Sequence, residues 1–483
     1  GPDYRYSTFV AAHGPVQDGV LEGDLVLYGT GDPTISGRFN ASQTAAFEAL
    51  ADSLQDLGIR RVAGDIVGDG SWFEGAGIGR GWQDTYITHT YAAPSGALNF
   101  NDNVVTFHVK PGASDAAPVV ITLLPAGTVP YRNAARTVAS GRTRVEVERE
   151  TYQAPLVLTG QMAVGSSPVW RAVPVPDPAH YTATAFAEVL VERGIQVDGQ
   201  VRAVHDPQHS AVGSQRVFAP SFEDERPVQV LAVHRSPPLQ EILTVINQRS
   251  HNLYADVVLR TVGRVATREG SIDGGAAAVL ALLEADSPEA ANLRMEDGSG
   301  LSVLNRASAG ALVELLAFMD SSDFREQYLA TLPQAGVDRG LRRMQETPAA
   351  GNLRAKTGTI ENVSALSGYV TAANGERLAF AIISNRVPST WAAKRIEDRI
   401  GGALAAVDRP LPRPDARSPG TGVLAGADAV ADNTRTYVIQ GGDTLEGIAR
   451  RHGVTLSELE AANPGVDPRR LMPGQELALP VGG

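Results

Sequence analysis

A proline-rich stretch near the C-terminus constrains the fold of this chain more than any other feature, because it divides the sequence into parts that must fold separately. Residues 408–435 carry four prolines between Pro410 and Pro419, followed by a run of Gly, Ala, Asp and Thr without apolar periodicity. Such a composition favours an extended linker over a packed core. We therefore expect a large N-terminal part and a separate unit over residues 436–481.

The short C-terminal unit has the pattern of a strand, two helices and a second strand. A strand is predicted at Tyr437–Gln440, and Asp443–Glu446 has the form of a capping box that begins a helix. A second capping box at Thr455–Glu458 begins another helix, which ends at Asn463-Pro464, and a strand is predicted at Glu476–Pro480. The expected module is βααβ.

The larger part changes its hydrophobic period near Pro237. Residues 21–229 are rich in short β-branched runs separated by Gly, Pro and Asn/Asp turns, which predicts mostly strands. From Pro237 to Val262 the apolar residues form helical stripes, interrupted at residues 249–252, and a further helix is expected at Asn305–Phe318. Three strands then follow, with the hairpin signal Asn374-Gly375 between the last two: Leu353–Thr359, Ala365–Thr371 and Leu378–Ser384. We expect an α/β (α+β) core in which helices flank an antiparallel sheet, with a large inserted β-rich region.

Composition excludes several classes of function. The chain of 483 residues has 42 Lys and Arg against 54 Asp and Glu, a net charge of −12, which argues against a nucleic-acid partner. It has no cysteine, which excludes thiol nucleophiles and Cys-ligated metals, and we expect no metal and no other cofactor. No apolar run reaches the length of a membrane span.

Two short motifs carry residue types that can do chemistry. Ser250-His251-Asn252 interrupts the two helical stripes, and alone it is typical of a helix end, because Ser and Asn favour caps. Lys356-Thr357-Gly358-Thr359 begins a predicted strand, where a lysine and hydroxyls can hold a substrate carboxylate and a glycine admits a substrate backbone. Alone, it is also typical of a surface strand end. Together they are two of the three motifs of serine penicillin-recognising enzymes, S-x-x-K, S-x-N and K-T-G.

Further segments strengthen this similarity over roughly residues 1–405. They occur in the family's order: Gly1–Tyr6, Tyr28–Thr34, Gly64–Asp69, Pro94–Asn101, Asp297–Leu301 and Leu353–Thr359. The chain resembles the D-alanyl-D-alanine carboxypeptidase/endopeptidase family of class C low-molecular-mass penicillin-binding proteins. The resemblance implies a penicillin-binding domain over residues 1–20 plus 230–407, with residues 21–229 inserted in it as one or more β-rich domains.

The resemblance also implies a mechanism on peptidoglycan stem peptides, with β-lactams as inhibitors. A serine attacks the penultimate D-alanine carbonyl, and water resolves the acyl-enzyme. Ser250 would relay a proton to the leaving amine, and Asn252 would position the acyl-side amide. Lys356 would supply positive potential, and Thr357, Gly358 and Thr359 would bind the substrate carboxylate and backbone, with the Thr359 N–H as an oxyanion-hole donor. His251 is expected to be a loop residue.

The family's nucleophile motif does not occur in these residues. The three lysines are preceded three positions earlier by residues other than serine: Phe107 before Lys110, Leu353 before Lys356 and Trp391 before Lys394. We expect the S-x-x-K motif to lie immediately upstream of Gly1, so that the chain as given is inactive.

The C-terminal unit resembles a LysM domain, which in its family binds N-acetylglucosamine-containing chains. The similarity rests on Gly442, Asp443, Thr444, Asn463 and Pro464, the expected glycan-binding residues. Two cell-wall modules on one chain predict a periplasmic or cell-surface protein that binds peptidoglycan through both.

Other interpretations remain open. One is a non-catalytic wall-binding or scaffolding homologue, and another is a β-lactamase or esterase on the same fold, although the inserted region of about 200 residues is large for such enzymes. Weaker motifs are expected to be structural: Gly29-x-Gly31 as a turn, His205 and His209 in a loop without metal, and Asp297–Gly300 as a turn.

Overall fold

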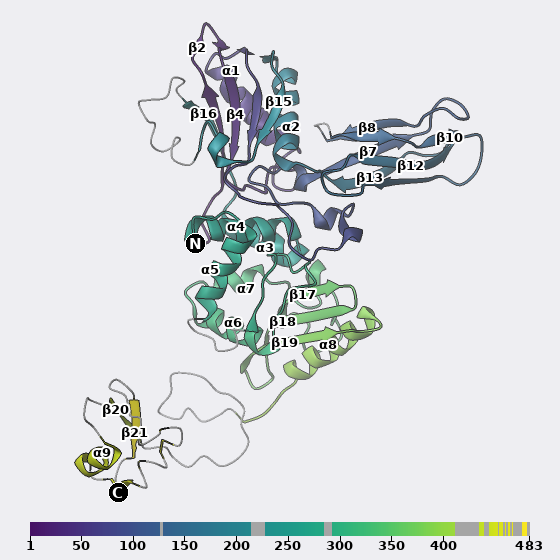
Figure 1. Cartoon of the computed structure of the whole chain (residues 1–483). Helices are drawn as coiled ribbons and strands as arrows, with labels where there is room; N and C mark the ends of the chain where they lie inside the picture. Colours follow the sequence, from purple (N-terminus) through teal and green to yellow (C-terminus); the bar gives the residue numbers. More distant parts are fainter. Residues whose placement is uncertain are drawn as a thin grey trace. The chain divides into compact units, whose positions relative to one another are not determined.

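The computed structural model describes residues 1–125, 129–213, 228–284, 292–410, 434–438, 444–452, 454–456, 459, 462–463, 466 and 476–480. Contacts divide the chain into two units, Gly1–Leu411 and Pro412–Gly483 (Figure 1). The division falls inside the stretch expected to be a linker. The expected fold class, an α/β core with helices on a sheet and a module at the C-terminus, is confirmed.

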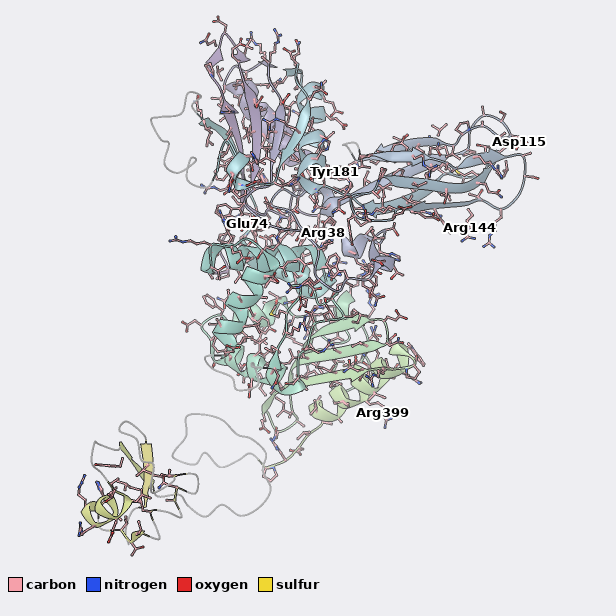
Figure 2. The ribbon with its side chains drawn as sticks, in the orientation of Figure 1. Arg38, Glu74, Asp115, Arg144, Tyr181 and Arg399 are labelled. Carbon is pink, nitrogen blue, oxygen red and sulfur yellow. The ribbon has the colours of Figure 1, made fainter. Side chains whose placement is uncertain are left out.

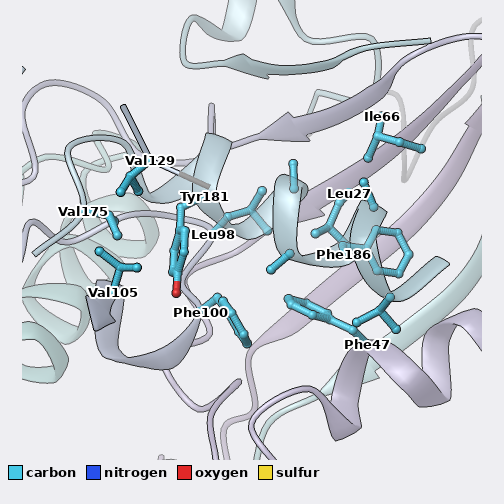
Figure 3. Close-up of a cluster of buried hydrophobic side chains, with 14 of the residues drawn as sticks. Leu27, Phe47, Ile66, Leu98, Phe100, Val105, Val129, Val175, Tyr181 and Phe186 are labelled. Carbon is cyan, nitrogen blue, oxygen red and sulfur yellow. The ribbon is translucent and has the colours of Figure 1, made fainter. Parts of the chain in front are cut away.

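The first half of the large unit is built on a five-stranded mixed sheet. In spatial order its strands are β15 (Val201–Val204), β6 (Ile66–Asp69), β4 (Asp24–Gly29), β1 (Ser7–His13) and β16 (Val228–Arg235). Helices α1 (Ala45–Asp56) and α2 (Pro178–Glu192) pack against it, although the sequence pattern predicted a mostly β region. Their aromatic and aliphatic side chains, Phe47 and Phe186 among them, form one buried core with Leu27 and Ile66 (Figure 3).

Strands β1 and β16 share one sheet with strands of the expected inserted region. The sequence predicts one penicillin-binding domain over residues 1–20 plus 230–407, and in the structure Ser7–His13 pairs antiparallel with both β4 and β16. Nearly all of β1 and β16 thus lies in the five-stranded sheet with strands from residues 21–229. The pattern of a strand does not say which distant strand completes its hydrogen bonds, and the domain boundaries stay a prediction.

A two-sheet arm extends from this region (Figure 1). One sheet has the order β13-β7-β8, and the other joins β10, β12 and β11, with β9 also paired to β12. The strands are β7 (Val104–Lys110), β8 (Val120–Leu124), β9 (Tyr131–Asn133), β10 (Arg136–Val138), β11 (Arg144–Glu148), β12 (Leu156–Ala163) and β13 (Val169–Pro174). Figure 2 shows Asp115 and Arg144 at the far end of the arm. A small sheet completes the region: β14 (Gln196–Val197), β5 (Arg61–Val62), β3 (Val20–Leu21) and β2 (Val16–Gln17).

The second half of the large unit places helices around a three-stranded antiparallel sheet. The strands run in the order β17 (Arg354–Ile360), β18 (Val363–Thr371) and β19 (Arg377–Asn385). Leu366 and Val370 face helix α8 (Thr390–Ala405), while Tyr369 donates a hydrogen bond to the Leu316 carbonyl of α6 (Ala309–Ser321). Helices α8 and α6 therefore cover opposite faces of the sheet.

Four more helices complete this half: α3 (Leu239–Arg249), α4 (Asn252–Ala266), α5 (Ile272–Glu284) and α7 (Arg325–Thr331). The predicted break between two helical stripes is the junction of α3 and α4. The predicted helix start at Asn305 is wrong, because α6 begins at Ala309 with Ser308 as its cap, and the Asn305 side chain is used in a loop.

The small unit contains strands β20 (Thr434–Val438) and β21 (Glu476–Pro480), paired antiparallel, and helix α9 (Leu445–His452). Leu445, Ile448 and Leu477 lie in its buried core. The cap of α9 is Thr444, whose Oγ1 accepts a hydrogen bond from the Gly447 N–H at 3.1 Å. Residues 457, 458, 460 and 461 of the second predicted helix lie outside the described residues.

Candidate active site

The two motifs singled out in the sequence meet in the folded chain. Lys356 extends from β17, and its Nζ donates a hydrogen bond of 2.7 Å to the Oγ of Ser250, which lies between α3 and α4. These residues are 106 positions apart in the sequence. A lysine that donates to the serine oxygen leaves the serine O–H free to donate in turn. The contact therefore joins a cation and a hydroxyl that can pass a proton.

Ser250 has a backbone conformation that is unusual for serine. Its φ of 55° and ψ of 52° lie in the left-handed region, where it ends α3, and its N–H bonds to the Ile246 carbonyl. Glycine is the usual residue at such a helix end, and a residue with a Cβ costs about 1 kcal/mol there. The tight reversal lets α4 begin at Asn252, two residues later, and leaves the Ser250 side chain exposed.

Asn252 is the first residue of α4, and its side chain contacts the segment before the arm. Its Nδ2 donates to the Tyr91 carbonyl at 2.9 Å, which leaves its Oδ1 available as an acceptor. The base of the arm fixes this segment in turn, since the Tyr152 hydroxyl donates to the Ala92 carbonyl at 2.9 Å and Arg149 donates to the Ile87 carbonyl at 3.0 Å. The amide is thus oriented by residues far from it in sequence.

The remaining predicted substrate-binding residues follow Lys356 along β17. Thr357 and Gly358 are half-buried and Thr359 is exposed, opposite Leu366, Ala365 and Ser364 of β18. Among the described strands, β17 is at the edge of its sheet. Gln334 bridges its outer side at Arg354, and from Lys356 onward that side can accept an extended peptide. An added Cβ at Gly358 would meet only the Ala365 side chain, at 3.5 Å. Because glycine has no side chain, a substrate backbone can approach the strand closely at this position.

The electrostatics of the site centre on Lys356. Burial lowers the pKa of Lys356 to about 8, because the partly enclosed ammonium loses hydration. Lys356 Nζ donates hydrogen bonds to the Ser250 hydroxyl and to the Thr357 carbonyl, both of which are uncharged acceptors. A cation without a bonded carboxylate is suited to an anionic group such as a peptide C-terminus.

Four further residues at the site were not predicted as functional. His251 Nε2 lies 3.3 Å from the Asp102 carboxylate, and Asp102 also accepts hydrogen bonds from the Tyr254 hydroxyl at 2.9 Å and from Arg38 at 2.7 Å. Figure 2 labels Arg38 in the region between the five-stranded sheet and the helices. The available sequence signal is Asn101-Asp102-Asn103, a run of residues that tolerate the left-handed conformation, which all three adopt.

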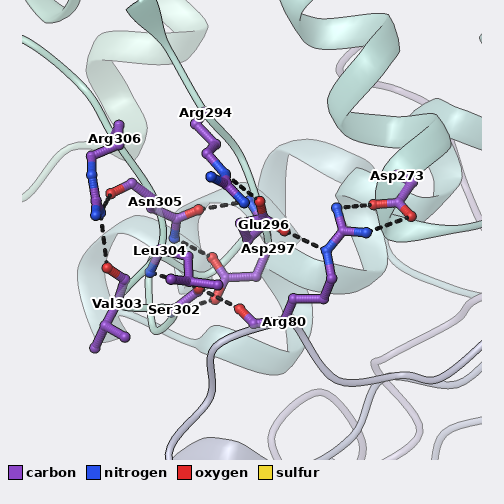
Figure 4. A network of polar contacts seen from close by, with 10 residues as sticks. All are labelled: Arg80, Asp273, Arg294, Glu296, Asp297, Ser302, Val303, Leu304, Asn305 and Arg306. Atoms are coloured by element: carbon purple, nitrogen blue, oxygen red, sulfur yellow. Dashed lines mark hydrogen bonds and ion pairs between the residues drawn. The ribbon is translucent and has the colours of Figure 1, made fainter.

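Asp297 belongs to a structural loop, in line with the predicted turn. Its carboxylate accepts from the Ser302 N–H at 2.6 Å and from the Asn305 side chain at 2.7 Å, while neighbouring Glu296 pairs with Arg80 and Arg294 (Figure 4). These contacts fix the turn after residue 296.

The alternative metal site at His205 and His209 gains no support from the geometry. His205 pairs with Asp177 at 3.0 Å and His209 with Asp206 at 3.3 Å. Among the residues that the structure describes, no group of three or more His, Asp or Glu is arranged to hold a metal ion.

Two predicted glycan-binding residues of the small unit can be placed. Thr444 caps α9, and the Asn463 side chain bonds to backbone, donating to the Leu459 and Ala478 carbonyls and accepting from the Ala478 N–H, each at 2.8 Å. Both thus have structural roles. Gly442, Asp443 and Pro464 lie outside the described residues.

Comparisons with known proteins place the chain in a family. The model of the D-Ala-D-Ala carboxypeptidase 3 (S13) family matches residues 1–407, and the LysM domain model matches residues 437–480. The D-alanyl-D-alanine carboxypeptidase of Actinomadura sp. (strain R39) is 31% identical over 84% of this chain and 73% of its own length. D-alanyl-D-alanine carboxypeptidase DacB of Haemophilus influenzae is 26% identical over 79% and 76%.

A solved structure supports the fold. Penicillin binding protein 4 (dacB) from Haemophilus influenzae superposes with a TM-score of 0.69 at 23% identity, covering 84% of this chain and 87% of that one. Within the described part of the chain, no helix has the length and apolar character needed to cross a bilayer. The family match over most of the chain decides the classification: the protein belongs to the D-Ala-D-Ala carboxypeptidase 3 (S13) family and carries a LysM domain near its C-terminal end.

Proposed function

We propose that this protein is a serine-type D-Ala-D-Ala carboxypeptidase and endopeptidase that hydrolyses peptidoglycan stem peptides and is inhibited by β-lactams. The observation that carries this proposal is the 2.7 Å hydrogen bond from Lys356 Nζ to Ser250 Oγ, together with family membership. The two residues come from a strand edge and a helix junction, and they join at a surface where an extended peptide can lie.

Ser250 and Asn252 act on the acyl and leaving groups. Ser250 accepts a hydrogen bond from Lys356, so its own proton is free to reach the leaving amine of the terminal D-alanine. Asn252 keeps one acceptor free beside its bond to the Tyr91 carbonyl, and this acceptor positions the substrate amide.

Residues of β17 bind the other end of the substrate. The ammonium of Lys356 attracts the terminal carboxylate, and Thr357 and Thr359 donate hydroxyl hydrogen bonds to it. Gly358 lets the substrate backbone approach, and the Thr359 N–H is one oxyanion-hole donor.

The test requires the nucleophile. None of the three lysines has a serine three positions earlier, so the experiment uses the product of the whole open reading frame. We expect that product to carry S-x-x-K, to be labelled covalently by a fluorescent penicillin and to release D-alanine from a D-Ala-D-Ala peptide. Rapid hydrolysis of the bound penicillin would indicate a β-lactamase instead. A product that is not labelled would overturn the enzymatic proposal and favour a wall-binding scaffold.

We propose further that the LysM domain anchors the protein to peptidoglycan glycan outside the cytoplasm, in the periplasm or at the cell surface. Because Asn463 and Thr444 bond within their own unit, changing them would disturb folding. The sharper variant is Asp443→Ala, with the exposed α9 residue Arg450→Ala as its control. Asp443→Ala should reduce retention on purified peptidoglycan, and Arg450→Ala should not. Retention that is unchanged after removal of residues 436–481 would refute the anchoring role.

A further inference from the structure

The left-handed turn at Ser250 needs support from outside the two helices that it joins. Only Ser250 and His251 separate α3 from α4, and Ser250 occupies a conformation that costs a serine about 1 kcal/mol. Strained backbone of this kind persists where surrounding contacts hold it. The contacts of Ser250 Oγ are on the substrate side, so the support must come from its neighbours.

His251 provides a contact on the opposite side of the turn. Its ring packs against the Tyr254 ring with centroids 3.8 Å apart, and its Nε2 lies 3.3 Å from Asp102 Oδ2. Only 16% of its side chain is exposed, whereas Ser250 beside it is open to solvent. Contacts with Asp102 and Tyr254 therefore fix His251, while Ser250 faces the substrate side.

Asp102 lies in a turn of three successive residues in the left-handed conformation. Asn101, Asp102 and Asn103 all have positive φ, between 50° and 55°. Asn103 is fully buried and holds this turn through hydrogen bonds to the Pro94 carbonyl at 2.9 Å and to Asn99 at 2.7 Å. Three successive left-handed residues without glycine are costly, and their effect is to carry one carboxylate to the start of α4.

The Asp102 carboxylate is ionised and shared by three donors. Burial alone would raise its pKa, but the hydrogen bonds and charges of His251 and Arg38 outweigh burial and hold the pKa of Asp102 well below its usual range. The Tyr254 hydroxyl donates to its other oxygen at 2.9 Å. Charge-assisted hydrogen bonds of this type are about twice as strong as neutral ones.

We propose that His251 is a positioning residue, which Asp102 anchors so that Ser250 stays within hydrogen-bonding distance of Lys356 and Asn252 stays aimed at the substrate amide. This role rests on the proposed carboxypeptidase function. It predicts that loss of the His251–Asp102 contact slows acylation while leaving substrate affinity and global stability nearly unchanged, because a shift of about 1 Å at reacting groups costs up to about 100-fold in rate.

The variants separate positioning from packing. His251→Leu keeps the bulk of the ring but removes the donor, and His251→Gln places an amide N–H near the position of Nε2. Asp102→Asn removes the charge. The matched control is His205→Leu, which breaks the contact of 3.0 Å between His205 and Asp177 elsewhere in the same unit.

In the product of the whole open reading frame, we expect His251→Leu to lower the rate of acylation by penicillin on the order of tenfold. The KM for a D-Ala-D-Ala peptide should stay within about twofold of the parent value. His251→Gln should recover most of the loss, His205→Leu should acylate at the parent rate, and the double variant His251→Leu/Asp102→Asn should be no slower than the slower single variant. Parent-rate acylation by His251→Leu, or equal losses in His251→Leu and His251→Gln, would overturn the role.

A second measurement does not depend on activity. In the 483-residue chain, His251→Leu and Asp102→Asn should speed backbone hydrogen exchange of residues 249–253 by about tenfold, and His205→Leu should not. Unchanged exchange at these residues would overturn the positioning role. Absence of penicillin labelling in the parent protein would instead overturn the proposed function, and the exchange result would still decide the role of His251.

Discussion

The two motifs of the site are held in place by different physical means. Lys356-Thr357-Gly358-Thr359 lies on a regular strand, where the ladder to β18 fixes each residue. Ser250-His251-Asn252 lies on a strained turn, and its orientation depends on Tyr91 and Asp102, which are more than 140 residues away. The backbone ladder of a strand therefore orients one motif, whereas long-range side-chain contacts orient the other.

The largest expected effect comes from removing the charge on the strand side. Lys356→Met keeps the aliphatic stem but removes the cation that bonds Ser250, so we expect penicillin acylation of the full product to fall roughly 10²- to 10³-fold. Lys394→Met on α8 is the matched control and should acylate at the parent rate. Equal acylation rates for the parent and Lys356→Met would mean that the charge of Lys356 does not contribute to acylation.

The next effect tests the ladder itself. A Cβ at Gly368 of β18 would lie 2.1 Å from the Arg354 carbonyl oxygen of β17, so Gly368→Val must push the two strands apart. We expect a loss on the order of 3 kcal/mol in the free energy of unfolding, measured in urea. Gly358→Ala, whose added Cβ meets only the Ala365 side chain at 3.5 Å, should change stability little. Similar losses in both variants would show that β17 is not held by close pairing.

A smaller effect concerns α4, which carries the turn. Asp256 of α4 is buried, and burial, followed by the charge of Asp297, raises the pKa of Asp256 to about 8. The folded chain therefore holds this proton while the unfolded chain releases it near pH 4, so Asp256 lowers stability increasingly as the pH rises from 4 to 8.

Asp256→Asn removes this dependence and can still accept from the Gly298 and Ser299 N–H groups. We expect it to be more stable than the parent by on the order of 2 kcal/mol at pH 8 and about equal at pH 4, as measured by denaturant unfolding. A parent protein whose stability advantage over Asp256→Asn grows with pH would contradict the raised pKa.

The smallest effect is the pH dependence of the strand side. Because the pKa of Lys356 is about 8, acylation should fall by about tenfold per pH unit above pH 8 as the cation is lost. Unfolding does not cause this fall. Because the pKa of Lys356 is lower in the folded chain, the charged lysine reduces the free energy of unfolding below pH 8, and this reduction disappears as the pH rises toward 10.5. Lys356→Arg, which stays charged, should move the alkaline limit upward, and an unchanged limit would assign it to another group.

Much of the fold could be predicted from local patterns. The alternation in residues 353–384 predicted an antiparallel meander, and β17, β18 and β19 form it, with Gly375 in the left-handed conformation that the Asn-Gly turn needs. The interruption at residues 249–252 likewise predicted the α3–α4 junction. In both cases the signal lies in residues that are close together in the sequence, so local conformational preferences are enough to produce the structure.

Other features could not be predicted because they depend on distant partners. Strand β1 pairs with β16, which lies more than 200 residues later, and no local pattern marks that partner. His251 lies in the loop between α3 and α4, as predicted, but nothing adjacent to it in the sequence marks Asp102 as its partner.

The sequence alone identifies the family to which the chain belongs and predicts which residues do the chemistry. The motifs Ser250-His251-Asn252 and Lys356-Thr357-Gly358 are short runs, and the types of residue in each run indicate its chemistry without knowledge of the fold. Only the tertiary structure decided that Lys356 bonds Ser250, that Asn252 bonds the Tyr91 carbonyl and that Asp102 meets His251. Such contacts form when burial of the core brings remote segments together, and no local pattern records which segments will meet.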